Sequence, residues 1–387
     1  MSRASYMLAA AWPSPAFGPH NLGRLVSAEC KYSCSRGSQC SSAAEIETTP
    51  RKTVMIPRQR IAVALPEGWL LKDNIARAQW AEEAGYDDLW LADGTGLDGL
   101  TLAAVLGCHT KRLRIGMSVT PAFTRSPAVL AATISVLEQV LPDRFAMGLG
   151  SSSEVIVSGW NGLPFAKPLT RVRDMLVATR SMLRGEKSNF DLETLQSHGY
   201  TQPALERPVP FYVAALRSRM IEMGAEMADG VILNLWPREA LGKLMNHVRI
   251  GAERAGKDPR SVEIVTRLMV FVTDDKARAR ELFRLQFAPY FATGVYNAFL
   301  AWIGQEEAAA KARAGWAEKN RDKTKTALTD ELIDEIAAFG NEEECRERVA
   351  WCAKAGVHTQ ILTPFPGMTP DEVERTYEAF RGFNPAR

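Results

Sequence analysis

The chain has 387 residues, of which 46% are apolar and 24% are charged, a balance that excludes a disordered chain, a collagen or a disulfide-framework mini-protein. Lys and Arg number 47 against 45 Asp and Glu, and the net charge of +2 gives no general electrostatic reason to expect nucleic acid or an anionic membrane as a partner. No uninterrupted stretch of about 18 apolar residues exists, so we expect no membrane span.

Residues 1–57 differ in composition from the rest of the chain. Ser, Pro, Arg and Cys are frequent, acidic residues are few, and no helical or strand period is sustained. We expect a disordered extension or one that is not translated, since Met55 stands just before the first convincing strand; a transit peptide or a secretory signal is the alternative. Cys30, Cys34 and Cys40 have no second ligand pair at a useful distance, so we expect no metal site.

From Arg60 onward, short β-branched runs alternate with amphipathic runs. Apolar residues of the first expected helix recur at three-residue steps, the spacing of one helix face, and Gly85 suits its C-terminal cap. A loop or hairpin is expected over 186–202, and a helical stretch over 275–339 is too long for one connection. The expected strands are 60–65, 88–92, 113–119, 144–149, 209–214, 230–233, 262–273 and 357–362; the expected helices are 74–84, 100–109, 127–141, 170–184, 217–228, 238–255, 342–355 and 370–381.

This alternation predicts the fold class. Nearly continuous apolar strands indicate burial on both faces, and eight strands each followed by a helix indicate an α/β (β/α)8 barrel of the TIM type over residues 58–387. A doubly wound open sheet is the alternative. Its usual GxGxxG signal is missing after the first strand, where the chain reads Leu-Pro-Glu-Gly over 65–68.

In such a barrel the functional residues gather in the loops that follow the strands. Here these loops hold small residues, hydroxyls and tryptophans, and they contain no GxSxG elbow, strand-end cysteine, HExxH motif or carboxylate cluster. A protein lined in this way needs a cofactor to carry its reaction.

Two turns suit an anionic cofactor. The turn after the fourth strand offers hydroxyls and open backbone N–H groups, although a Gly/Ser-rich loop is also an ordinary turn. The turn after the fifth strand has small side chains that let a flat ring approach the backbone, and the start of the next helix favours a phosphate. The first turn holds Gly150, Ser151 and Ser152, and the second holds Ala214, Ala215, Leu216, Arg217 and Ser218.

Three stretches, in order and at these separations, form a specific pattern. The first covers residues 115–121 and continues with Arg-Ser-Pro-Ala at 125–128. The second is Pro-Asp-Arg-Phe-Ala-Met-Gly-Leu-Gly-Ser-Ser at 142–152. The third covers 210–215 and is followed by Ala-Asp-Gly at 228–230. From about residue 60 to 380 the chain resembles the luciferase-like flavin monooxygenase superfamily, and most closely its deazaflavin (coenzyme F420)-dependent oxidoreductases. The resemblance implies a (β/α)8 barrel with a helical insertion after strand 7, and a flavin or 5-deazaflavin at the C-terminal mouth.

The resemblance also implies roles near the ring. Asp93 matches an acidic residue beside the deazaflavin, although Gly94 stands where several relatives carry a histidine. Ser118 and Val119, followed by Thr120, match a pair joined by a non-proline cis peptide that forms a bulge behind the ring.

Further roles follow for the loops around the ring. The Ala214–Leu216 backbone matches a cofactor contact, and Glu154 lies near a catalytic acid proposed for certain relatives, in a loop that is one residue longer here. Trp69, Trp160, Asn161 and Tyr296 are expected to contact substrate. The alternatives are that Asp93 caps a loop, that Trp160 is a core lid, and that Tyr296 packs between helices or subunits.

The expected function is hydride transfer between reduced coenzyme F420 and a small organic substrate. The alternatives are an FMN-dependent luciferase-like monooxygenase and a non-catalytic flavin-binding barrel. We expect a cytoplasmic homodimer that binds neither nucleic acid nor membrane.

Overall fold

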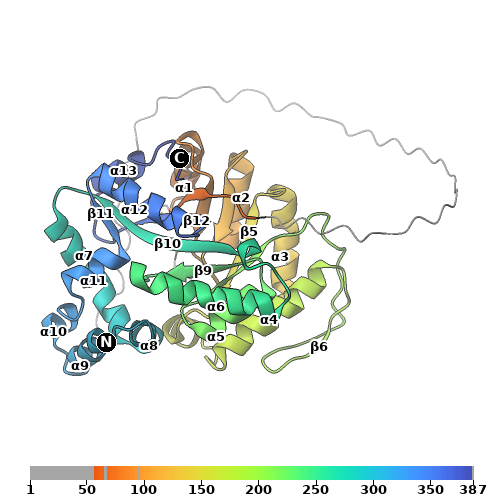
Figure 1. Cartoon of the computed structure of the whole chain (residues 1–387). Coiled ribbons are helices and arrows are strands. Elements are labelled where there is room, and N and C mark those ends of the chain that lie inside the picture. Colours follow the sequence, from red (N-terminus) through yellow and green to blue (C-terminus); the bar gives the residue numbers. More distant parts are fainter. Residues whose placement is uncertain (1–55, 65–67, 95, 386–387) are drawn as a thin grey trace, which may run out of the picture.

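Eight parallel strands close into a barrel in the computed structural model, which describes residues 56–64, 68–94 and 96–385 (Figure 1). The last gap closes because β9 pairs with β10, so the predicted (β/α)8 barrel is confirmed. In order around the barrel, the strands are β1 (Arg60–Val63), β2 (Asp88–Leu91), β3 (Arg114–Met117), β5 (Phe145–Gly150), β8 (Phe211–Ala214), β9 (Gly230–Asn234), β10 (Glu263–Val272) and β12 (Thr359–Pro364).

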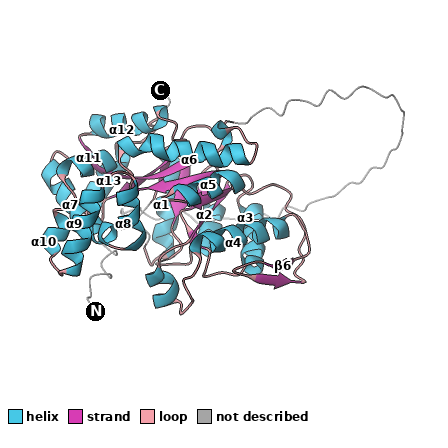
Figure 2. Cartoon of the chain, turned by 60° about the horizontal axis from the view of Figure 1, so that its bottom comes forward, coloured by secondary structure: helices cyan, strands magenta, loops and turns pink. Residues whose placement is uncertain are grey.

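Helices surround the strands (Figure 2). Their starts follow local chemistry: the Asp98 carboxylate accepts a hydrogen bond from the N–H of Thr101, and Asn341 forms a reciprocal capping box with Glu344. The barrel helices are α1 (Leu71–Glu83), α2 (Gly99–His109), α3 (Pro127–Val140), α4 (Pro168–Leu183), α5 (Ser218–Met227), α6 (Leu241–Arg254), α12 (Glu342–Lys354) and α13 (Pro370–Glu378), with 3₁₀ turns η2 (Arg238–Ala240) and η3 (Pro259–Ser261).

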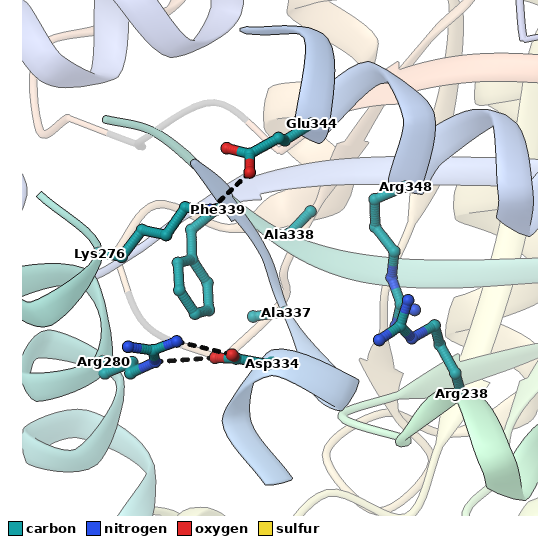
Figure 3. Close-up of a pocket in the computed structure, with 9 residues that line it drawn as sticks. All are labelled: Arg238, Lys276, Arg280, Asp334, Ala337, Ala338, Phe339, Glu344 and Arg348. Atoms are coloured by element: carbon teal, nitrogen blue, oxygen red, sulfur yellow. Dashed lines mark hydrogen bonds and ion pairs between the residues drawn. The ribbon is translucent and has the colours of Figure 1, made fainter. Parts of the chain in front are cut away.

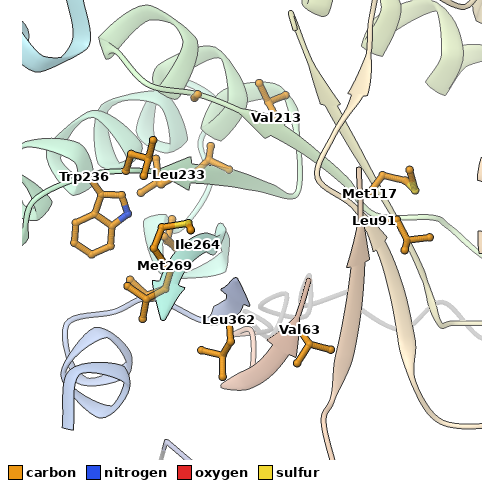
Figure 4. Packing of buried hydrophobic residues seen from close by; sticks show 14 of the residues in the cluster. Val63, Leu91, Met117, Val213, Leu233, Trp236, Ile264, Met269 and Leu362 are labelled. Carbon is orange, nitrogen blue, oxygen red and sulfur yellow. The ribbon is translucent and has the colours of Figure 1, made fainter. Parts of the chain in front are cut away.

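Two apolar layers follow from the alternation of side chains along each strand. The outer layer, which includes Val63, Leu91 and Leu233, fills the space between strands and helices (Figure 4). The inner layer fills the barrel itself. A Cβ on Gly116 would lie 2.5 Å from the Trp90 ring, so glycine there makes room for the indole. The inner residues are Ala62, Trp90, Ala146, Tyr212, Ile232, Val265 and Ile361.

A buried ionic network closes the barrel at the N-terminal ends of its strands. Arg114 Nη2 lies 2.6 Å from the Asp88 carboxylate and 2.8 Å from that of Glu263. Glu263 also accepts hydrogen bonds from the hydroxyls of Tyr212 (2.6 Å) and Thr359 (2.6 Å). Since barrel enzymes work at the opposite end, this network serves stability.

The predicted insertion after the seventh barrel strand is confirmed, and it lies to one side of the barrel (Figure 1). Buried Asn297 holds it together by donating to the carbonyl oxygens of Phe291 and Ala309, each at 2.7 Å. The expectation of helix up to residue 339 is wrong at its end, because the chain returns to the sheet as a short strand beside β10. The insertion comprises α7 (Lys276–Ala292), α8 (Gly294–Trp302), α9 (Glu306–Ala317), α10 (Arg321–Lys325), α11 (Asp330–Ile336) and β11 (Ala338–Gly340).

The smaller elements also bear on the predictions. The expected hairpin at 186–202 is present as β6 (Asn189–Asp191) paired with β7 (Gln196–His198). Residues 1–55, and Leu65 at the end of the first expected strand, lie outside the described residues. Among the described helices, none has the length and apolar character needed to cross a membrane.

Candidate active site

The floor of the barrel mouth is made of small apolar groups. Ala64, Val119 and Ala214 are half-buried and rest on the inner layer. The expected cis peptide between Ser118 and Val119 is present. A Cβ on Gly150 would lie 2.5 Å from Val119 Cγ2 and 3.4 Å from Ala214 Cβ, so any side chain there would crowd the floor. The result is a floor of small, partly exposed apolar side chains.

A hydroxyl without a partner lies beside this floor. Thr120 begins the short strand β4 (Thr120–Pro121), which pairs with the end of β5. Its Oγ1 is buried and has no hydrogen-bond partner among the described residues. Buried polar groups are nearly always satisfied, so this hydroxyl is an exception. Thr120 is 0% exposed, so a bound group would meet the hydroxyl only by displacing the side chains that cover it.

Asp93 lies at the end of β2 and is held by Arg125. Arg125 Nη2 approaches Asp93 Oδ2 to 3.2 Å, and the backbone N–H of Gly99 donates to Asp93 Oδ1 at 3.3 Å. Burial alone would lower the pKa of Arg125, but the charges of Asp93 and Asp98 raise it above its usual value. The Asp93 carboxylate, about 10% exposed, therefore sits at the mouth with one fixed orientation.

The loop after β5 contains an irregular helix that the sequence did not reveal. Ser151 and Ser152 are half-buried, and Ser152 has φ of +61°, a left-handed conformation that non-glycine residues rarely adopt. The exposed Glu154 immediately precedes the π-helix η1 (Val155–Trp160). Asn161 ends this helix by donating from Nδ2 to the carbonyl oxygen of Ile156 at 2.7 Å, so its amide shapes the loop.

The turn after β8 runs directly into α5. Ala215 is buried, Leu216 and Ser218 are half-buried, and Arg217 is exposed. Arg217 is the N-cap residue, and its side chain makes no capping hydrogen bond to the helix. The helix start and the exposed Arg217 thus follow the C-terminal end of β8, the same end of the barrel as the floor.

The insertion reaches the mouth through Tyr296. Its phenol oxygen accepts a 2.9 Å hydrogen bond from Asn234 at the end of β9. Burial raises the pKa of Tyr296, an effect that the Asn234 bond and the nearby Arg267 charge partly offset. Arg267 belongs to β10 and is paired in register with Asn234. Neither residue was among the site residues predicted from the sequence. Asn234 was visible there at the end of an expected strand. Arg267 lies in the middle of β10, and its sequence position gave no signal.

Two tryptophans stand exposed on the loops after β1 and β5. Trp69 is 69% exposed and Trp160 is 53% exposed. Trp160 therefore is not a core lid in this structure. Large exposed apolar side chains around a mouth are typical of a surface that contacts a ligand or a partner. Among the described residues, no three His, Cys, Asp or Glu side chains gather where they could hold a metal ion.

Comparison with known proteins agrees with this architecture. The luciferase-like monooxygenase family profile matches residues 55–359. The 5,10-methylenetetrahydromethanopterin reductase of Methanolobus tindarius is 27% identical over 293 residues, which is 75% of this chain and 89% of the relative. The F420-dependent glucose-6-phosphate dehydrogenase of Mycolicibacterium gilvum is 28% identical over 237 residues, 56% of this chain and 70% of the relative.

Solved structures share the fold at lower identity. The coenzyme F420-dependent tetrahydromethanopterin reductase of Methanopyrus kandleri has a TM-score of 0.68 at 18% identity, covering 84% of this chain and 97% of its own. The oxygenating constituent of 3,6-diketocamphane monooxygenase of Pseudomonas putida, in complex with FMN, has a TM-score of 0.62 at 16% identity, with coverage of 86% and 99%. With a closed eight-stranded barrel and a profile match over most of its length, the chain belongs to the luciferase-like monooxygenase family.

Proposed function

We propose that the protein is a coenzyme F420-dependent oxidoreductase that moves hydride between the deazaflavin and a small organic substrate. The observation that carries this proposal is the floor of small apolar side chains, Ala64, Val119 and Ala214, beside Gly150, where a Cβ has no room. Similarity to an F420-dependent glucose-6-phosphate dehydrogenase supports the choice of cofactor. Reduced F420 supplies the hydride when bound, so no amino-acid nucleophile is needed.

The residues of this chain would bind and orient the two reactants. Val119 and Ala214 would support one face of the ring, and Thr120, which the sequence predicts as a cofactor contact, would lie beneath them as a fully buried side chain. Asp93, fixed by Arg125, would lie beside the ring. Holding both reactants in one orientation replaces a bimolecular encounter by a pre-oriented one.

The remaining predicted residues divide between the cofactor and the substrate. The Gly150–Ser152 turn and the 214–218 turn would take the anionic part of the cofactor, with Arg217 adding charge at a helix start. Trp69, Trp160, Asn161 and Tyr296 would line the substrate side. Glu154, exposed at the start of η1, would be the nearest candidate acid on that loop.

The second candidate function is an FMN-dependent monooxygenase. It draws on the fold shared with the FMN-bound oxygenating constituent of 3,6-diketocamphane monooxygenase. The homodimer and the cytoplasmic location also remain proposals, which size-exclusion chromatography with light scattering and cell fractionation would test.

A fluorescence titration of the full chain with F420 and with FMN tests the proposed cofactor. We expect F420 to bind with micromolar or better affinity and FMN much more weakly. Gly150→Ala should weaken F420 binding at least tenfold, about 1.4 kcal/mol, because the added Cβ pushes Val119 out of the floor.

Gly159→Ala is the matched control, since a Cβ there meets nothing within 4 Å. Its F420 affinity should stay within twofold of that of the wild type. Tight FMN binding without F420 binding would establish the monooxygenase candidate instead. Equal affinities in the two glycine variants would reject the floor as the ring site.

A further inference from the structure

A pocket of about 240 Å³ lies outside the barrel mouth, where the insertion rejoins the sheet (Figure 3). Four cationic and two acidic side chains line it, together with the apolar groups of β11 and the residue before it. The cations therefore outnumber the acids. The lining residues are Arg238, Lys276, Arg280, Asp334, Ala337, Ala338, Phe339, Glu344 and Arg348.

Two of the four cations are neutralised by acids of the pocket wall. Lys276 Nζ lies 2.5 Å from Glu344 Oε1, and Arg280 pairs with Asp334 through two hydrogen bonds of 2.9 and 2.7 Å. Figure 3 shows the Arg280–Asp334 pair on one side of the pocket and the Arg348 and Arg238 side chains together on the other. Arg238 is itself paired with Glu335, which lies outside the lining.

Arg348 is the one cation of the pocket lining that forms no salt bridge with an acidic side chain among the described residues. It is only 7% exposed, and its Nη2 donates to the carbonyl oxygen of Glu335 at 2.5 Å. Its Nε and Nη1 are buried and have no hydrogen-bond partner among the described residues. Burial and the nearby Arg238 charge lower the pKa of Arg348 to about 10, so the guanidinium is still protonated at neutral pH.

The guanidinium carbon of Arg348 lies 5.0 Å from the centroid of the Trp351 ring, a cation–π contact that stabilises the face of the cation. The ring does not satisfy the two unused N–H donors at the edge, and an anion would complete them. The planar fork of arginine matches two oxygens of a tetrahedral or planar oxyanion. Arg238 brings a second guanidinium beside it, although the Glu335 carboxylate already balances that charge. The Arg238 side chain is 41% exposed, so this edge of the pocket is in contact with solvent.

We propose that this pocket is an oxyanion site, separate from the barrel mouth, in which Arg348 and Arg238 bind a phosphate group. The phosphate is either the free ion or part of a phosphate ester, since both present the same oxygens. This site is independent of the proposed cofactor.

Thermal unfolding of the full chain in potassium phosphate, compared with potassium chloride of equal ionic strength, tests the site. We expect phosphate to raise the unfolding midpoint of the wild type by a few degrees, as ligands that bind only the native state do. Arg348→Met should lose this rise. In chloride it should be at least as stable as the wild type, because it removes a buried charge that lacks an anion.

Calorimetric titration then measures affinity directly. The Arg238 side chain is 41% exposed, so the variant Arg238→Met should fold. It should bind phosphate at least fivefold more weakly than the wild type. Arg249→Met is the control, because Arg249 is an exposed partner of Glu253 in α6; its affinity should be unchanged. A titration with adenosine monophosphate distinguishes a phosphate ester from the free ion as the ligand. If adenosine monophosphate binds more tightly than inorganic phosphate, the ligand is an ester; if it binds more weakly, the ligand is the free ion.

Three results would overturn the site. One is a phosphate response that survives in Arg348→Met. Another is equal destabilisation of Arg348→Met in both buffers, which a purely structural arginine would give. The third is loss of the phosphate response when F420 is present at saturation, which would make the pocket part of the cofactor site.

Discussion

Asn234 donates a hydrogen bond from Nδ2 to the phenol oxygen of Tyr296 over 2.9 Å. Asn234 ends a barrel strand and Tyr296 lies in an insertion helix 62 residues later in the chain. This bond ties the insertion to the mouth of the barrel. Since burial raises the pKa of Tyr296, the phenol keeps its proton at neutral pH and can donate it in a hydrogen bond to a bound molecule.

Tyr296→Phe tests that role. Loss of the hydrogen bond should lower the free energy of unfolding by about 1 kcal/mol, measured in denaturant. The affinity for F420 should change less than twofold, because we place Tyr296 against the substrate. Tyr290→Phe is the control, because the Tyr290 ring packs edge-on against Tyr296 with centroids 5.8 Å apart. Removing its hydroxyl should change neither the free energy of unfolding nor the affinity for F420. A large fall in F420 affinity would place Tyr296 at the cofactor.

The two acids that hold Arg125 should differ in effect. Asp93→Asn should weaken F420 binding about tenfold, because Asp93, which we place beside the ring, loses its charge and its ion pair with Arg125. Asp98→Asn should leave that affinity nearly unchanged, since Asp98 serves as the N-cap of α2. Fluorescence titration of both variants decides the matter. Equal losses would mean that Arg125, rather than Asp93, is the group that the cofactor needs.

Arg217→Ala should weaken F420 binding about ten- to a hundredfold. A charge-assisted contact to an anionic tail contributes roughly 1.5–3 kcal/mol, and Arg217 is exposed at the start of α5, where it is free to make one. The loss should shrink at high salt. Arg249→Ala, in a surface pair, is the control. If Arg217→Ala binds F420 with unchanged affinity, the barrel mouth remains the proposed ring site. The cofactor's phosphate then does not bind at the 214–218 turn.

The buried network at the base of the barrel predicts a pH dependence of stability. Burial alone would raise the pKa of Glu263, but the Arg114 charge and three hydrogen-bond donors lower it to about 2. A carboxyl whose pKa is lower in the folded than in the unfolded chain stabilises the fold above its unfolded pKa and loses this effect as pH falls toward the folded pKa. The stability from Glu263 should therefore decline from about pH 4.5 toward pH 2.

Glu263→Gln should remove this part of the pH dependence. Its unfolding free energy, measured in denaturant, should be lower than that of the wild type at neutral pH and should approach it as the solution becomes acidic. Glu253→Gln, on the surface of α6, should follow the wild-type curve. A difference between Glu263→Gln and wild type that does not change with pH would show that Glu263 acts as a neutral hydrogen-bonding group.

A chain that begins at Met55 should match the full chain in thermal midpoint and in F420 affinity. The described fold is anchored from Arg58, which pairs with Asp87, and from Gln59, which donates to the carbonyl oxygen of Ala353. Both contacts survive this truncation. A midpoint several degrees lower in the shorter chain would show that residues 1–54 contribute to the fold.

The alternation of apolar strands with helices was enough to predict the barrel. Each strand buries both faces and therefore appears in the sequence as a nearly continuous apolar run. It could not predict the network around Arg114, whose partner Glu263 is 149 residues away. The π-helix at 155–160 was also missed, since its sequence carries no period that separates it from a loop. Nothing in the sequence singled out Arg348, because its helix has an ordinary amphipathic pattern. Only the fold shows that this side chain is buried without an acidic partner in the part of the chain that the structure describes.

The insertion leaves the sheet and returns to it along a single edge. Its last strand pairs Ala338 with Val270, two residues before β10 ends at Val272, and the N–H of Thr273 bonds to the carbonyl oxygen of Gly340. A segment that starts and finishes on neighbouring backbone can be lengthened, shortened or exchanged while the strand order of the barrel stays the same. Selection could therefore alter the helices that carry Tyr296 separately from the barrel that carries the proposed ring floor. If Tyr296 contacts the substrate as we propose, substrate range and cofactor choice would evolve as separate traits.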